Sequence, residues 1–167
     1  CCLGIFGPKS RELLTKVFGK KFSKDEFKFG IGKKIIIKNI ELWFQRISYV
    51  GELGWEIYIP TEYAELIYDQ ITIFEEKFNL VHAGAHAMDI MRMEKGYLHW
   101  GHDISTAETP YEAGLGFAIK INKSENFIGK ESLENNKKER KKKLVMFTLD
   151  KSTPGNPLLL HDEPIYY

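Results

Sequence analysis

Three short runs of β-forming residues follow one another in the first half of the chain. The runs are residues 33–40, 42–49 and 55–59. The first is rich in β-branched side chains, and the second alternates between apolar and polar side chains. Asn39 and the Gly-Glu-Leu-Gly segment at 51–54 supply turn residues between them. Because strands joined by tight turns pair antiparallel, these runs predict an antiparallel sheet.

Segments with helical spacing flank the predicted strands. Residues 3–8 resemble a strand that enters a Gly-Pro turn, and a helix is expected over 11–18 with Ser10 as its cap. A longer helix is expected over 64–78, because its apolar residues fall on one face. Gly19 is expected to end the first of these helices, and Thr61 is expected to cap the longer one. A further helix is expected over 85–95, with Gly96 at its end. Helices mixed with antiparallel strands indicate the α+β class.

The last third of the chain predicts a change of domain. Residues 116–121 look strand-like and residues 127–135 look like a short helix. The expected division places one domain at 1–136, a basic linker at 137–143, and the start of a β-rich domain at 144–167. Strands are expected over 144–149 and 158–167. Because the chain begins at Cys1 without Met and ends inside a strand-like segment, we expect it to be a piece of a longer protein.

The charge balance argues against partners that are recognised through a strong electrostatic field. Lysine and arginine number 24 against 23 aspartate and glutamate residues, which gives a net charge of +1. No apolar run reaches the roughly 20 residues of a membrane span. Neither nucleic acid nor a membrane is therefore predicted as a partner.

Two local patterns have a functional interpretation that competes with a structural one. His99, His102 and Asp103 form a loose trio, but zinc sites need three or four well-placed ligands, so no metal site is predicted. The basic run at 137–143 could bind phosphates or a polyglutamate tail, although a solvated linker is the favoured interpretation.

The chain has two cysteines, Cys1 and Cys2, and they are adjacent. Two cysteines are too few for a Cys-based zinc site, and neighbouring residues rarely form a relaxed disulfide, so neither a zinc site of this kind nor a disulfide framework is predicted.

Asp89 and Arg92 lie three residues apart on the predicted helix over 85–95, so they are expected to pair on one of its faces.

The stretch from Ser48 to Glu56 is the most informative part of the sequence. Strand alternation places Glu56 on the opposite face from Trp55 and Ile57. A carboxylate between apolar neighbours is costly unless it has a partner, and an ionised Glu accepts two hydrogen bonds side by side. Such a group suits a ligand with adjacent N–H donors, as in a 2-aminopterin ring. Tyr49 and Trp55 could stack on a flat heterocycle, whereas the competing interpretation is an ordinary exposed strand glutamate.

Five ordered segments resemble one known family. They are LGIFGPKSRELL at 3–14, ISYVGELGWEIYIP at 47–60, AGAHAMDIMRMEKGYLHWGHDI at 83–104, TPYEAGLGFAI at 109–119 and FIGKESL at 127–133. They are similar to the glycine-cleavage T-protein family of tetrahydrofolate-dependent aminomethyltransferases, and closer to the folate-binding C-terminal region of sarcosine and dimethylglycine dehydrogenases. The resemblance implies a T-protein-type folate-binding domain followed by the start of a C-terminal β-barrel.

The resemblance also implies a site. The family's folate-binding tyrosine and glutamate match Tyr49 and Glu56. Further candidates for the wall of the folate channel are Trp55, Tyr97, Trp100, His102 and Asp103. Met88 stands where classical T-proteins carry a ligand-binding Arg, which favours the dehydrogenase branch. The family's catalytic Asp has no counterpart in these residues, so this piece alone is expected to bind folate poorly and to be inactive.

The implied chemistry moves a one-carbon unit from a methylated glycine or an aminomethyl donor to tetrahydrofolate. FAD is implied only if a further domain precedes Cys1. The expected compartment is the cytoplasm of a bacterium or the mitochondrial matrix of a eukaryote. Two alternatives stay open: a folate-dependent demethylase of a sulfonium or methoxy substrate, and a non-catalytic folate-binding module. The module's KGCYxGQE-like signature is absent, because residues 94–100 read EKGYLHW.

Overall fold

The chain folds into two units, one of residues 1–99 and one of residues 100–167. The computed structural model describes residues 1–20, 22–137, 142–151, 153–156, 163–164 and 166. The predicted division at the basic run lies partly outside these residues and stays a prediction. Each unit is described by itself.

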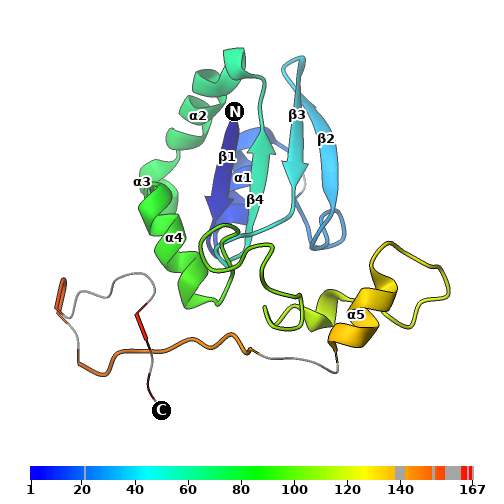
Figure 1. Cartoon of the computed structure of the whole chain (residues 1–167). Helices are drawn as coiled ribbons and strands as arrows, with labels where there is room; N and C mark the ends of the chain where they lie inside the picture. The colour runs from blue at the N-terminus through cyan, green and yellow to red at the C-terminus, as the bar shows by residue number, and fades with distance from the viewer. Residues whose placement is uncertain (21, 138–141, 152, 157–162, 165, 167) are drawn as a thin grey trace. The chain divides into compact units, whose positions relative to one another are not determined.

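A four-stranded antiparallel sheet forms the first unit. Its strands are β1 (Cys2–Phe6), β2 (Gly32–Ile37), β3 (Ile40–Gln45) and β4 (Gly54–Tyr58). Their order in the sheet is β1-β4-β3-β2, so the first strand pairs with the last (Figure 1). The antiparallel sheet that the sequence predicts is therefore confirmed, and β4 lies in its interior.

The β2–β3 hairpin turns at the position that the sequence predicts. Lys38 and Asn39 both have positive φ, at 47° and 67°. Two consecutive residues with positive φ are the mark of the type I′ turn, whose twist matches that of the flanking strands. Asn tolerates this conformation better than most residues, which explains its place in the turn.

The first helix, α1 (Ser10–Phe18), lies behind the sheet in Figure 1. Gly19 ends it in the left-handed conformation with φ 60°, as expected. The prediction that Ser10 caps the helix is wrong, because Lys9 occupies the cap position and Ser10 is the first helical residue. The buried Ser10 hydroxyl instead shares its single proton between two carbonyl oxygens, that of Gly7 at 2.6 Å and that of Leu53 at 2.9 Å, and so holds the helix start against the residue that precedes β4.

The helix predicted over 64–78 is divided. It consists of a 3₁₀ turn η1 (Thr61–Tyr63), then α2 (Ala64–Thr72), then α3 (Glu75–Phe78). The prediction of a single helix fails at Ile73 and Phe74, and Thr61 makes no capping hydrogen bond. The next helix, α4 (Ala85–Glu94), agrees with the sequence to within a residue. Gly96 follows it with φ 71°.

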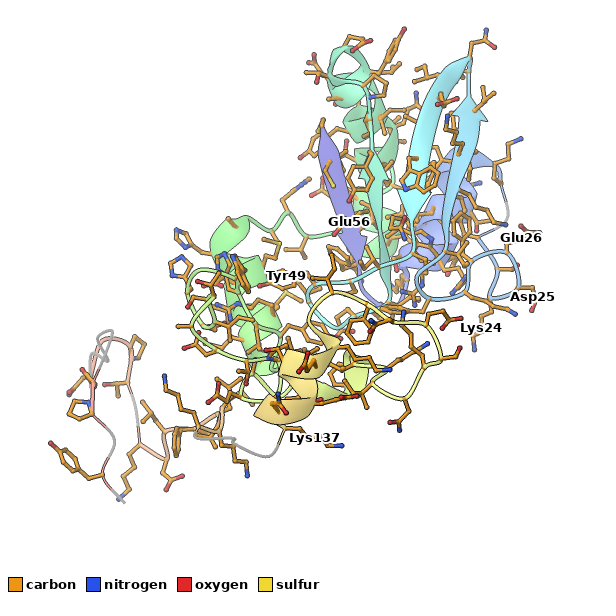
Figure 2. All side chains as sticks on the ribbon, turned by 45° about the vertical axis from the view of Figure 1, so that its right-hand side comes forward. Lys24, Asp25, Glu26, Tyr49, Glu56 and Lys137 are labelled. Atoms are coloured by element: carbon orange, nitrogen blue, oxygen red, sulfur yellow. The ribbon has the colours of Figure 1, made fainter. Side chains whose placement is uncertain are left out.

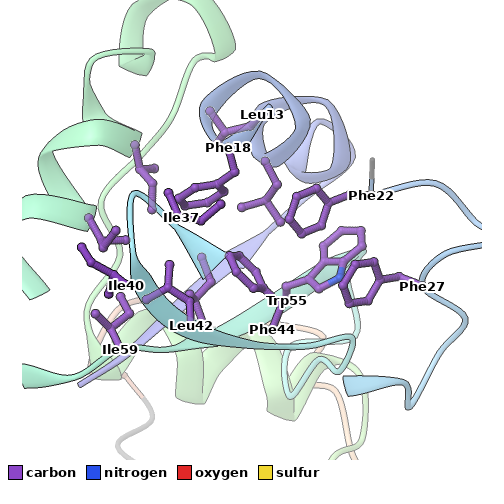
Figure 3. Packing of buried hydrophobic residues seen from close by; sticks show 14 of the residues in the cluster. Leu13, Phe18, Phe22, Phe27, Ile37, Ile40, Leu42, Phe44, Trp55 and Ile59 are labelled. Carbon is purple, nitrogen blue, oxygen red and sulfur yellow. The ribbon is translucent and has the colours of Figure 1, made fainter. Parts of the chain in front are cut away.

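The hydrophobic core lies between the sheet and the helices α1 and α2. Aromatic rings fill its centre, where Phe22 stacks on Phe27 at 5.2 Å and meets Trp55 edge-on at 5.8 Å (Figure 3). Aliphatic side chains of β3, β4 and α2 complete it; the fully buried ones are Leu42, Ile57, Ile67 and Ile71. One face of the sheet is thus covered, and the residues that alternate with the core residues occupy the other face.

The second unit contains two short helical segments, η2 (Gly116–Ala118) and α5 (Lys130–Asn136). The strand predicted over 116–121 is therefore wrong. A reciprocal turn precedes η2, in which Thr109 Oγ1 donates to Glu112 and the Glu112 N–H donates to Thr109. The strand predicted over 144–149 is not formed either, and most of the segment 158–167 lies outside the described residues.

Candidate functional site

The connection between β3 and β4, residues 46–53, is a tight turn held by an ion pair. Gly51 has φ 71°, in the region that favours glycine. Lys95 lies over it, since a Cβ built at Gly51 would come 2.6 Å from the Lys95 Cγ. The Lys95 ammonium also pairs with Glu52 at 3.0 Å. The turn between the two predicted ligand-binding residues is therefore held to the end of α4.

Tyr49 is half-buried in this turn and is fixed at both ends of its side chain. Its hydroxyl donates to the carbonyl oxygen of Leu98 at 3.0 Å. Its ring stacks on Tyr97, with centroids 6.5 Å apart and planes 15° from parallel. The structure thus brings together two of the predicted site residues, Tyr49 and Tyr97, from parts of the chain that are far apart in sequence.

Glu56 lies in β4 on the face opposite to the core, as alternation predicts. Its partners in register are Gly4 on β1 and Gln45 on β3. The Tyr58 hydroxyl donates to Glu56 Oε2 at 2.6 Å, and this hydrogen bond raises the pKa of Tyr58 to about 12. Figure 2 shows Glu56 beside the sheet and Tyr49 in the turn of the same unit. Glu56 is half-buried, which leaves its carboxylate accessible to a ligand.

Trp55 lies on the other face, contrary to the expectation of a channel wall next to Glu56. Its side chain is completely buried and meets the stacked rings of Phe22 and Phe27 edge-on, and the guanidinium groups of Arg11 and Arg46 lie 4.9 and 5.0 Å from the centre of its ring. Burial, and then the charge of Arg11, lower the pKa of Arg46. Trp55 is therefore a core residue, since consecutive strand residues point to opposite faces.

Three other predicted wall residues belong to the second unit. Trp100 is largely exposed and forms an isolated bridge with Ile104, and the Gly101 N–H donates to the Ile104 carbonyl oxygen at 2.7 Å. His102 and Asp103 lie in the same turn and are exposed. Their role as channel wall stays a prediction.

The predicted pair on α4 is present. Arg92 is buried, and its guanidinium donates to Asp89 at 2.7 Å and to the carbonyl oxygen of Tyr97 at 3.1 Å. His99 lies 4.0 Å from the same Asp89 carboxylate. Arg92 thus holds the segment that carries Tyr97 against the helix, and through Tyr97 it supports Tyr49.

The sequence reasoning overlooked one residue that contacts Glu56. Tyr58 stands two positions after Glu56, so it shares the same strand face and can reach it. The spacing of the two residues could have indicated this contact from the sequence. Glu56 and Tyr58 stand on either side of an apolar strand residue, Ile57, which is buried on the other face.

Neither metal-binding nor membrane-spanning elements are found in the part of the chain that the structure describes. No group of three or more His, Cys, Asp or Glu side chains there could hold a metal ion. No described helix has the length and hydropathy needed to cross a bilayer.

A model of one protein family, the GCVT N-terminal domain, matches residues 1–123. The chain belongs to this family. The family resemblance that the sequence predicts is therefore confirmed, and the predicted start of a C-terminal β-barrel stays a prediction.

Curated relatives of this family member include dehydrogenases and aminomethyltransferases. It is 39% identical over 148 residues to human mitochondrial dimethylglycine dehydrogenase, covering 88% of this chain and 17% of that protein. It is 35% identical over 153 residues to human mitochondrial sarcosine dehydrogenase, covering 91% and 17%. An aminomethyltransferase of Caldanaerobacter subterraneus subsp. tengcongensis is 38% identical over 148 residues, covering 88% and 39%. The chain spans less than a fifth of the length of the two dehydrogenases.

A solved structure shows the same fold. It is the crystal structure of glycine cleavage system aminomethyltransferase T from Bartonella henselae, with a TM-score of 0.68 and 24% identity. The match covers 83% of this chain and 36% of that one. The α+β architecture of this family member is thus the aminomethyltransferase fold.

Proposed function

We propose that this chain is the tetrahydrofolate-binding portion of an aminomethyltransferase-like enzyme. The enzyme would transfer a one-carbon unit to tetrahydrofolate from a methylated glycine, such as dimethylglycine or sarcosine, or from an aminomethyl donor. The observation that carries the proposal is the half-exposed carboxylate of Glu56 on the face of the sheet opposite to the core. Membership of the GCVT family and the similarity to dimethylglycine and sarcosine dehydrogenases support it.

The residues present fit a pterin. The pterin ring offers adjacent N–H donors, and an ionised carboxylate accepts such a pair in a bidentate manner. Glu56 is accessible and is not paired with a cation among the described salt bridges. It can therefore serve as the anchor for this edge of the ring.

Tyr49 has a supporting role in this proposal. Its hydrogen bond to Leu98 and its stacking on Tyr97 hold the turn that precedes Glu56 in one conformation. A ligand held by pre-arranged side chains loses less free energy to ordering on binding. Tyr49 and Glu56 would thus orient the pterin, and orientation with exclusion of water is the main contribution of the protein to such a transfer.

When bound, tetrahydrofolate would supply the nucleophilic nitrogens that take up a one-carbon unit at the oxidation level of formaldehyde, and the amine would be the leaving group. An aminomethyl donor already carries the unit at this level, whereas a methylated glycine would first have to be oxidised to its imine, with FAD of a further domain as the oxidant. The described residues bind and orient. We assign no proton-transfer role to any of them, because the resemblance places the catalytic Asp outside this sequence.

The proposal is tested by replacing the Glu56 carboxylate. Glu56→Gln should weaken tetrahydrofolate binding by about 1–3 kcal/mol, the range for a lost charge-assisted hydrogen bond. Fluorescence titration of the full-length protein that contains this chain with tetrahydrofolate measures this. Glu41→Gln is the matched control, because Glu41 has the same charge on the same face of the neighbouring strand and pairs with Lys34 at 2.8 Å. Equal affinities of the wild type and Glu56→Gln would exclude the assignment.

A further inference from the structure

The face of the sheet opposite to the core presents a row of four residues in register. From edge to edge they are Gly4, Glu56, Gln45 and Gly32. Two of the four are glycines, and each glycine has an aromatic ring over it. A Cβ at Gly4 would meet the Phe6 ring, and a Cβ at Gly32 would overlap the Trp43 ring. Glu56 is therefore the one ionisable side chain of this row. At the two ends of the row, the rings of Phe6 and Trp43 form flat apolar surfaces.

Gln45, the polar neighbour of Glu56 in the row, is engaged elsewhere. Its Oε1 accepts the Trp43 indole N–H at 3.0 Å, and its Nε2 donates to the carbonyl oxygen of Gly30 at 2.9 Å. Both ends of the amide thus have partners other than Glu56. Among the described hydrogen bonds, Gln45 makes none to the carboxylate, although it lies directly beside it.

Tyr58 is the hydrogen-bond donor to Glu56 within the described part of the chain. The two side chains come from the same strand and the same face, and the O–O distance of 2.6 Å is that of a strong bond to a carboxylate. Tyr58 lies between Cys2 and Trp43 in register, so neighbours on both sides limit its movement. A carboxylate has about four lone-pair sites, and this bond occupies one of them.

We propose that Tyr58 is a positioning residue for Glu56, which holds Oε2 so that the remaining lone pairs face two neighbouring N–H donors of a pterin. This rests on the proposed function and adds a residue to it. A free glutamate side chain has several rotamers, and a bound ligand must select one of them. The Tyr58 hydroxyl makes that selection before the ligand arrives, so its loss should reduce affinity without removing the charge.

The test compares Tyr58→Phe, Glu56→Gln and the double variant in tetrahydrofolate titrations of the full-length protein that contains this chain. Tyr58→Phe should weaken binding about 3- to 10-fold, the cost of ordering one flexible side chain. In the Glu56→Gln background the same change should have little further effect, because the residue acts through the carboxylate. Tyr68→Phe is the matched control, because Tyr68 is exposed to a similar extent and its hydroxyl bonds to His82 at 2.9 Å on another element. Thermal unfolding of each variant verifies that it is folded.

A second readout needs no ligand. The hydrogen bond from Tyr58 to Glu56 raises the pKa of the phenol to about 12, with Cys2 and Glu56 as the titratable groups that face it. In Glu56→Gln the pKa should fall toward the ordinary value of about 10. The ultraviolet absorbance difference between each protein and its Tyr58→Phe counterpart isolates this titration from the other tyrosines.

The outcomes separate the two proposals. If the full-length wild type does not bind tetrahydrofolate, the proposed function fails and this proposal fails with it. If the wild type binds and the effects of the two substitutions simply add, or if the Tyr58 titration is unchanged in Glu56→Gln, only the positioning role is excluded. Coupled binding effects together with a lowered pKa support it.

Discussion

Trp55 and Glu56 are neighbours in the chain and have opposite surroundings. The indole is completely buried among aromatic rings, whereas the carboxylate lies on the face opposite to the core, beside Tyr58. Strand geometry alone produces this contrast, since successive side chains point to opposite faces. Substitution at Trp55 should therefore affect folding, and substitution at Glu56 should affect binding.

Arg92 should contribute to stability rather than to ligand contact. It is 5% exposed and donates to Asp89 and to the Tyr97 carbonyl oxygen. Arg92→Leu removes these charge-assisted bonds and should lower the free energy of unfolding by about 1.5–3 kcal/mol. Chemical denaturation of the protein measures the change.

Asp89→Asn is the comparison for this prediction. The Asp89 side chain is 53% exposed, and its loss leaves the bond from Arg92 to Tyr97 in place. Its effect should therefore be clearly smaller than that of Arg92→Leu. Equal effects would mean that the ion pair, and not the bond to the backbone, holds the segment after α4.

The end of α1 allows a test at the scale of an element. Gly19 ends the helix with φ 60°, and a Cβ there would meet no atom within 4 Å. Gly19→Ala should thus cost about 1–2 kcal/mol through backbone conformation alone. Thermal or chemical unfolding measures this cost.

Gly84 offers the matched control. It precedes α4 with φ −89°, and a Cβ there also meets nothing within 4 Å. Gly84→Ala should therefore be neutral or slightly stabilising. A loss at position 84 equal to that at position 19 would contradict the conformational explanation.

The strands could be predicted from the sequence more accurately than the helix ends. β-branched residues and Asn39 indicated the β2–β3 hairpin, because both act within a few residues. The break between α2 and α3 gave no such signal, since the apolar spacing of Ile71, Phe74 and Phe78 continues through it. Ser10 was misjudged for a different reason: its hydroxyl reaches Leu53, a tertiary partner that local spacing cannot indicate.

The site shows the same division between local and distant information. The face of Glu56 followed from alternation, and its partner Tyr58 is local enough to have been inferred. The stacking of Tyr49 on Tyr97 and the bond from Tyr49 to Leu98 depend on where α4 ends in space. The family resemblance named Tyr49 and Tyr97 as site residues, but it did not predict these contacts between them and with Leu98.

At the scale of the whole molecule, the two units differ in how much apolar surface they bury. The core cluster consists entirely of residues between Leu13 and Phe78. In the second unit, Ala113 is the only buried hydrophobic residue among those that the structure describes. Burial of apolar area is the main favourable term in folding, so the units should differ in independent stability.

A chain of residues 1–99 should unfold cooperatively by itself, and a chain of residues 100–167 should show no cooperative transition. Circular dichroism during heating measures both. A cooperative transition in the second piece would mean that residues beyond the described part complete a core there. A structureless first piece would show that its sheet requires a further partner.

The pairing of β1 with β4 has a consequence for synthesis on the ribosome. β1 leaves the exit tunnel roughly 50 residues before β4, its neighbour in the sheet. The apolar side of α1 emerges soon after β1 and therefore also precedes β4. At about 5–20 residues per second this delay is about 3–10 s. During that interval Leu13, Leu14 and Phe18 lack β4 and its buried Trp55 and Ile57, so this stretch is where a chaperone would meet the nascent polypeptide.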